Sequence, residues 1–129
     1  MNEEEKKEVD ALKLLCLLNL AACQLKTQDY SDAILSCHKA LDIDTKNVKA
    51  LFRRAQAYSR TADWENAKAD LMEAIKLAPN NKDLRNELDL LKKNMSEYKE
   101  KQKKMFAGMF DKMSKPDVSQ SKETEENNK

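Results

Sequence analysis

The residues best suited to bind an anion lie in one short stretch, NVKALFRRAQAY, at residues 47–58. Lys49 and Arg53 are four positions apart, so their side chains share one face of a helix. An ammonium and a forked guanidinium placed side by side can both donate to one carboxylate. No acidic residue lies three or four positions from either of them to neutralise them. We predict a carboxylate-binding site on this face, and we predict that Arg54 points away from it into packing or a salt bridge.

The chain repeats itself with a period of 34 residues. A shift of 34 aligns Ala21 with Ala55, Tyr30 with Trp64, and Asn47 with Asn81, and Ala33 and Ala40 also meet alanines. Small residues at these positions let helices approach closely, and an aromatic residue opens every second helix. This pattern resembles the tetratricopeptide repeat, in which antiparallel helix pairs stack into a superhelix. Asp29 and Asp63, which precede the aromatic residues, are predicted to cap the second helix of each pair.

Composition and pattern together predict an all-α protein with two such repeats and a long C-terminal helix. The single glycine is Gly108, so the first hundred residues lack the glycines that strand turns usually need. We expect a charged N-terminal segment, two tetratricopeptide repeats, one amphipathic helix and a disordered tail, at residues 1–10, 11–47, 48–81, 82–113 and 114–129, respectively.

The repeat register adds an amide to the predicted site. Asn19 and Arg53 occupy the same position in successive repeats, so the superhelix is expected to present them side by side on its concave surface. With Lys49, they would offer an amide, a guanidinium and an ammonium to one carboxylate. Phe52 and Gln56 are predicted to border the same groove.

Three runs, LLCLLNLAACQLK, KALFRRAQAY and KMFAGMF, resemble the C-terminal tetratricopeptide domain of the large immunophilins, of the forty-kilodalton cyclophilin type or the FK506-binding type. The resemblance implies binding of the acidic EEVD peptide that ends a cytosolic heat-shock chaperone, of the ninety-kilodalton class or alternatively the seventy-kilodalton class. It also implies a carboxylate clamp in which Asn19 matches the second-repeat Asn, and Lys49 and Arg53 match the third-repeat pair. A cytoplasmic location, with the nucleus as a second compartment, follows from the same resemblance.

The sequence departs from that family at its N-terminus. The run MNEEEKKEVDALK is too short for a helix pair and has no lysine with an asparagine four residues on, so the first-repeat half of the clamp has no counterpart. The isomerase domain of the family is also absent, and we expect the chain to be a fragment or a truncated product. Loss of two charge-assisted donors would remove about 3–6 kcal/mol of binding free energy. From a micromolar peptide, this leaves an affinity that is millimolar or weaker.

Other classes of function have little support in the sequence. The formal net charge of +1 argues against nucleic acid as a partner, and no apolar run is long enough for membrane insertion. Three cysteines without CxxC spacing, a lone His38 and the absence of a glycine-rich loop predict no enzyme activity, no metal and no cofactor.

Two further interactions stay open at this stage. The run MSEYKEKQKKMFAGMFDKM is basic and amphipathic, as calmodulin-binding segments are, although it could equally be a helix overhang that packs on another chain. The residues that would contact calmodulin are Lys99, Lys101, Lys103, Lys104, Met105, Phe106, Met109 and Phe110. Alternatively, an uncovered apolar face of the first helix, with Leu14, Cys16, Leu17 and Leu18 as its candidate residues, predicts a homodimer.

Overall fold

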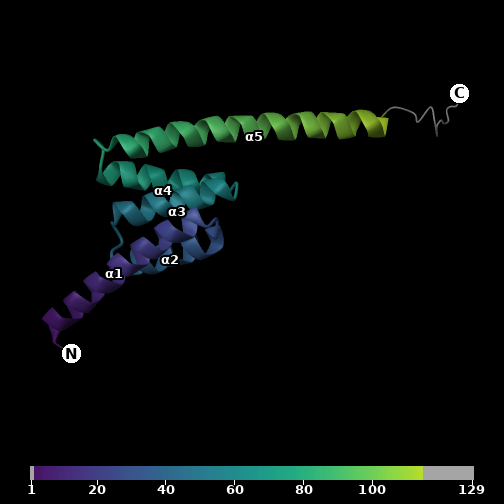
Figure 1. Cartoon of the computed structure of the whole chain (residues 1–129). Helices are drawn as coiled ribbons and strands as arrows, with labels where there is room; N and C mark the ends of the chain where they lie inside the picture. Colours follow the sequence, from purple (N-terminus) through teal and green to yellow (C-terminus); the bar gives the residue numbers. More distant parts are fainter. Residues whose placement is uncertain (1, 115–129) are drawn as a thin grey trace, which may run out of the picture. The chain divides into compact units, whose positions relative to one another are not determined.

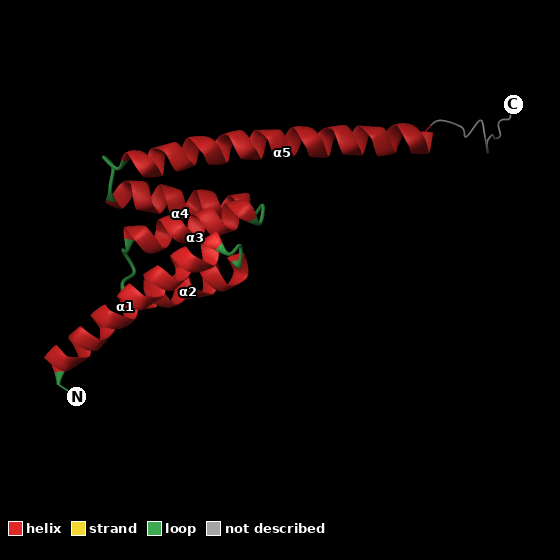
Figure 2. Cartoon of the chain, viewed as in Figure 1, coloured by secondary structure: helices red, strands yellow, loops and turns green. Residues whose placement is uncertain are grey.

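The computed structural model describes residues 2–114, and all regular secondary structure in this range is helical (Figures 1 and 2). This confirms the predicted all-α class. The chain divides into two compact units, residues 1–92 and the remainder, which are described separately. The helices are α1 (Glu3–Lys26), α2 (Tyr30–Ile43), α3 (Val48–Arg60), α4 (Trp64–Leu77) and α5 (Lys82–Ser114).

Helices α1 to α4 form two antiparallel pairs, α1 with α2 and α3 with α4, as Figure 1 shows. The pairs contact each other through α2 and α3 and through α1 and α3. Alanines fill the crossing points, as the repeat pattern predicts, and at most 1% of each is exposed. They are Ala21, Ala33, Ala40, Ala55, Ala67 and Ala74. A larger side chain at any of them would push two helices apart.

The first helix begins within the charged segment that we expected to precede the first repeat. Asn2 and Glu5 form a capping box, in which Glu5 N donates to Asn2 Oδ1 at 2.8 Å and Asn2 N donates to Glu5 Oε1 at 3.2 Å. Glu3, Glu4 and Glu5 also place negative charge in the first turn, where the helix dipole favours it. Local capping therefore extends α1 by two turns beyond the predicted boundary at residue 11.

Asparagines cap the helices that follow the interrepeat loops. Asn47 Oδ1 accepts from Ala50 N at 2.9 Å, and Asn81 Oδ1 accepts from Asp83 N at 2.9 Å. The prediction that Asp29 and Asp63 cap α2 and α4 is wrong. The Asp29 carboxylate accepts from Thr27 Oγ1 and the Asp63 carboxylate from Asn66 Nδ2, so competing side-chain donors take the oxygens away from the helix amides.

Helices α1 and α3 end in the same tight turn, 34 residues apart. Gln28 and Ala62 adopt positive φ angles of 65° and 61°. Asp29 N donates to Gln24 O, and Asp63 N donates to Tyr58 O, both at 2.8 Å. These are the backbone hydrogen bonds of a Schellman motif, in which glycine is the favoured residue at the left-handed position. The chain accepts the strain of an L-residue there because the turn must reverse direction within three residues.

Arg54 joins α3 to both helices that flank it. Its Nε and Nη2 donate to the two oxygens of Asp70 on α4 at 2.7 and 2.6 Å, and its Nη1 donates to His38 Nδ1 on α2 at 2.7 Å. Its guanidinium also lies over the ring of Tyr58. The hydrogen bond to Asp70 is the main reason that the pKa of Arg54 is raised. The predicted role of Arg54 in a salt bridge is thus what the structure shows.

The start of α5 closes the first unit. Leu84 and Leu91 are each 1% exposed, and Arg85 donates to Pro79 O at 3.0 and 2.7 Å through Nε and Nη2. Residues 93–114 of α5 belong to the second unit and are helical. Except for Ser114, the predicted disordered tail lies outside the described residues. Among the described residues, none of the helices combines the length and apolarity needed to cross a bilayer.

One part of the predicted uncovered face of α1 is wrong. Leu18 is buried, and Leu14 and Leu17 are half-buried, whereas Cys16 is exposed as expected. The error arises because α2 and α3 both pack against α1, and their contacts rotate the exposed face away from Leu18. 

We predict that Ala62→Gly stabilises the fold by about 1 kcal/mol, because glycine carries no steric penalty at a positive φ. Urea unfolding followed by far-UV circular dichroism measures the change. Ala22→Gly, in the interior of α1, is the matched control and should destabilise by about 1 kcal/mol. Equal effects of both changes would contradict a strained turn at Ala62.

We predict that Asp70→Asn destabilises the fold by about 3 kcal/mol, because it leaves the partly buried Arg54 guanidinium without its counter-charge. The Arg54→Met/Asp70→Leu double variant should recover most of that loss, since it removes both charges. The same urea unfolding measures all three chains. A double variant no more stable than Asp70→Asn would show that the hydrogen bonds, rather than the balance of charge, hold these helices together.

Candidate functional site

The predicted carboxylate site lies where α3 meets α1. Lys49 and Arg53 are one turn apart on α3, and Asn19 lies on α1, the helix that α3 contacts across the repeat boundary. Both helices are the first member of their pair, so the repeat stacking places them next to each other. The site therefore depends on the interrepeat contact rather than on either helix alone.

A single hydrogen bond fixes Arg53 against α1. Its Nη1 donates to the backbone carbonyl oxygen of Leu18 at 2.7 Å. Leu18 is buried and directly precedes Asn19, so the guanidinium is held beside the turn of α1 that carries the predicted amide donor. One N–H of the fork is used in this contact, and the remaining N–H groups stay available to a ligand.

Lys49 supplies a cation without a counter-charge. Its side chain is exposed, and within residues 2–114 its ammonium makes no ion pair. Helix α3 carries no acidic residue between Val48 and Arg60, although it contains four basic ones. The side of α3 that holds Lys49 and Arg53 is consequently positive, and an anion there meets no competing carboxylate from the same helix.

The two predicted groove residues are placed less tightly. Phe52 and Gln56 are both half-buried. Gln56 lines a small cavity of about 60 Å³ together with Leu25, Tyr30 and Arg60. Arg60 Nη1 donates to the hydroxyl oxygen of Tyr30 at 3.4 Å, which links the end of α3 to the start of α2.

Sequence reasoning missed two participants in this region. Arg60 follows Lys49 and Arg53 at positions that share one helix face, and that spacing could have identified it. The Leu18 carbonyl could not have been found, because every residue carries the same backbone group and only the packing of α3 on α1 selects this one. Arg54 takes no part, since Asp70 and His38 occupy its guanidinium.

The predicted calmodulin-type residues lie in the second unit. Residues 99–110 are helical, and every side chain among them is exposed. Met105, Phe106, Met109 and Phe110 are between 57% and 71% exposed, which leaves four large apolar side chains on one segment in contact with solvent. Within the described chain, no group of three or more His, Cys, Asp or Glu residues is arranged to hold a metal ion.

Known proteins share this architecture. The tetratricopeptide repeat family model matches residues 48–81. Human peptidyl-prolyl cis-trans isomerase FKBP4 is 40% identical over 112 residues, which cover 87% of this chain and 24% of that protein. The chain thus spans about a quarter of the length of the curated relatives that it matches.

Solved structures agree with the sequence match. The C-terminal repeat-containing domain of a putative FK506-binding protein from Plasmodium falciparum superposes with a TM-score of 0.72 at 35% identity, over 78% of this chain and 66% of that one. The C. elegans myosin chaperone UNC-45, solved in complex with an Hsp90 peptide, has a TM-score of 0.68 at 34% identity, over 97% of this chain and 14% of that one. The chain is a tetratricopeptide-repeat domain, a protein-interaction module similar to the one found in FK506-binding proteins.

Proposed function

We propose that this domain binds the acidic C-terminal peptide of a heat-shock chaperone, of the EEVD type, through a partial carboxylate clamp formed by Asn19, Lys49 and Arg53. The observation that carries the proposal is the hydrogen bond from Arg53 to the Leu18 carbonyl. It holds the guanidinium at the junction of α1 and α3, so that three donors converge from two helices. The domain would act as the chaperone-binding part of a cytoplasmic co-chaperone, and its own role in that complex is binding rather than catalysis.

The chemistry of the site suits a carboxylate terminus. The Arg53 fork and the Lys49 ammonium both carry positive charge, and hydrogen bonds between charged partners are the strong ones. Because Arg53 is already held in place by α1, less rotamer freedom is lost when a ligand binds. The Asn19 amide adds a neutral donor that helps to fix the orientation of the carboxylate.

The side chains upstream of the terminal carboxylate also have a basic surface to meet. Arg60 lies seven residues beyond Arg53, about 10 Å along α3. An extended peptide covers that distance in about three residues. A peptide that runs along α3 from Arg53 toward Arg60 would therefore bring a glutamate of EEVD near the Arg60 guanidinium. The solved UNC-45 complex with an Hsp90 peptide, at 34% identity, supports the choice of ligand.

The incomplete clamp sets the expected affinity. With no counterpart of the first-repeat lysine and asparagine, the described donors are fewer than the family's full set. Loss of two charge-assisted hydrogen bonds removes about 3–6 kcal/mol, and a micromolar interaction then becomes millimolar or weaker. Binding at this strength is fast and reversible, and salt should weaken it because the donors are solvent-exposed.

We predict that a peptide ending in EEVD shifts the amide signals of α1 and α3 in an NMR titration at low salt, with a dissociation constant in the millimolar range. Lys49→Ala and Arg53→Ala should each weaken binding about tenfold or more, because each removes a charge-assisted donor. Lys39→Ala, which removes an exposed cation from α2, is the matched control and should bind as the parent chain does.

The peptide itself supplies a second control. Replacing its terminal carboxylate by a carboxamide should abolish the shifts, because the clamp recognises that group. If the amidated peptide bound equally well, or if Lys39→Ala lost as much affinity as Lys49→Ala, general electrostatic attraction would explain the binding and the clamp assignment would be wrong.

A second candidate function is supported by the exposed apolar side chains on residues 105–110 and the lysines that precede them. We predict that calmodulin binds residues 92–113 in the presence of calcium, since it grips basic amphipathic helices. Tryptophan-free calmodulin lets the fluorescence of a dansyl label report the complex. Phe106→Ala/Phe110→Ala should abolish it, and binding that survives removal of calcium would speak against this mode.

A further inference from the structure

Helix α1 is apolar on two opposite faces. One face, which includes Leu18 and Ala21, packs into the domain. The opposite side carries a second row of apolar residues at intervals of three or four positions, which we call the outer face of α1. It consists of Val9, Leu12, Cys16, Leu20 and Cys23. All five are exposed, and the exposed fractions reach 64% for Leu12 and 47% for Leu20.

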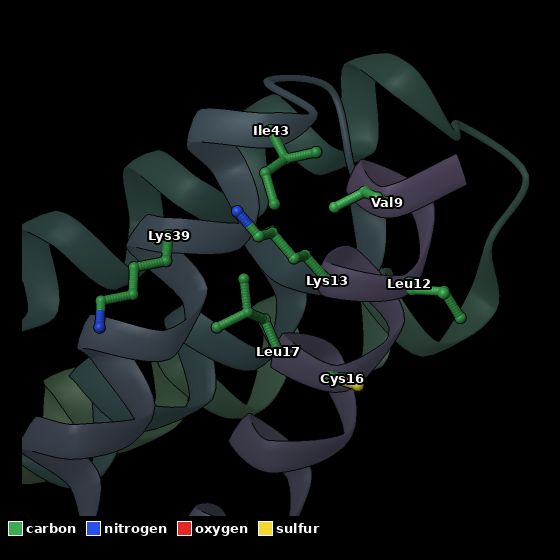
Figure 3. A pocket seen from close by; sticks show the side chains of 7 residues that line it. All are labelled: Val9, Leu12, Lys13, Cys16, Leu17, Lys39 and Ile43. Atoms are coloured by element: carbon green, nitrogen blue, oxygen red, sulfur yellow. The ribbon is translucent and has the colours of Figure 1, made fainter. Parts of the chain in front are cut away.

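The outer face continues into a hollow between α1 and the end of α2. The hollow has a volume of about 610 Å³, and its walls come from α1 between Val9 and Leu17 and from Lys39 and Ile43 of α2. Figure 3 shows Val9, Lys13 and Leu17 turned toward Ile43. Helices that are hydrophobic all round are normally buried on all sides, and a continuous exposed apolar patch marks an interaction surface. No described residue covers this one.

Two features of the outer face fit an identical helix. Val9, Cys16 and Cys23 recur every seven residues, and Leu12 adds the intervening position, which is the spacing of a seam between two paired helices. The charges on the same side are also self-complementary. Glu5 and Glu8 lie at the start of the row and Lys26 at its end. A parallel pair would place the glutamates together, whereas an antiparallel pair places Lys26 of each copy near the glutamates of the other.

We propose that the outer face of α1 is a homodimer interface, in which the α1 helices of two copies pack antiparallel about a two-fold axis near Cys16. A two-fold contact of this kind is closed, so it yields dimers rather than open chains. The interface does not depend on the proposed peptide site, because none of the five outer-face residues belongs to the clamp. Either of the two sites could be lost without the other.

Sedimentation velocity of the full chain over a range of concentrations tests the proposal. The parent chain should move from one to two copies as its concentration rises. Leu12→Glu should raise the dimer dissociation constant about 100-fold, because the two-fold axis introduces the buried charge twice. Leu35→Glu is the matched control, since Leu35 is 51% exposed on α2 and lies outside the outer face. It should leave the dimer unchanged.

Cross-linking with a short bismaleimide tests the orientation. In an antiparallel pair centred near Cys16, the two Cys16 thiols lie close together and the two Cys23 thiols lie far apart. Cross-linking should therefore survive in Cys23→Ser and disappear in Cys16→Ser. A parallel pair would bring both cysteines next to their counterparts, so each single variant would still cross-link. Cys37 is buried, and desolvation raises its pKa to about 11, so it should not react.

Several outcomes would overturn the proposal. A parent chain that stays monomeric at every concentration would leave the outer face to some other partner. A dimer that Leu12→Glu does not weaken, or that Leu35→Glu weakens equally, would have its interface elsewhere. A dimer lost in Phe106→Glu instead would be formed by α5. Circular dichroism of each variant checks its fold, and the EEVD peptide titration of Leu12→Glu, which should match that of the parent chain, keeps this result separate from the clamp.

Discussion

The close approach of helices at the buried alanines is the constraint on which the rest of this domain depends. Ala21, Ala33 and Ala40, with their counterparts one repeat later, leave no exposed surface beyond 1% and no room for a longer side chain. Because the helices approach at these points, α1 and α3 come into contact across the repeat boundary. That contact puts the Arg53 guanidinium within hydrogen-bond distance of the Leu18 carbonyl. The candidate peptide site is therefore a consequence of how the repeats pack.

The neighbouring residues Arg53 and Arg54 show how one helix serves two purposes. Successive residues on a helix point about 100° apart, so the two guanidinium groups face different neighbours. Arg54 meets Asp70 and His38 and holds three helices together, whereas Arg53 meets only the backbone of α1 and keeps donors for a ligand. The ion pair thereby supports the binding site indirectly, because it fixes the rotation of α3 and with it the direction of Lys49 and Arg53.

Helix α1 carries three separate functions on three sides. Its inner side completes the packed core through Leu18 and Ala21. Its side toward α3 presents Asn19 to the candidate clamp. Its outer face, from Val9 to Cys23, is apolar and exposed. If a second copy covers that outer face, each dimer would present two peptide sites, and avidity toward a chaperone that is itself dimeric could offset the weakness of each partial clamp.

The sequence by itself determined the repeat architecture and the membership of the candidate site. A period of 34 residues fixes helix pairs and their stacking, and the register then relates Asn19 to Arg53 without coordinates, because equivalent positions in stacked repeats are neighbours. Helical spacing likewise separates Arg54 from Arg53. Only the tertiary structure decided which groups meet across helices. Asp29 and Asp63 lose their expected capping role to side-chain donors, Leu18 turns out to be buried, and its carbonyl becomes the anchor of Arg53. These outcomes depend on the rotation of one helix against another, and that rotation is set by packing, which a local pattern of residues does not record.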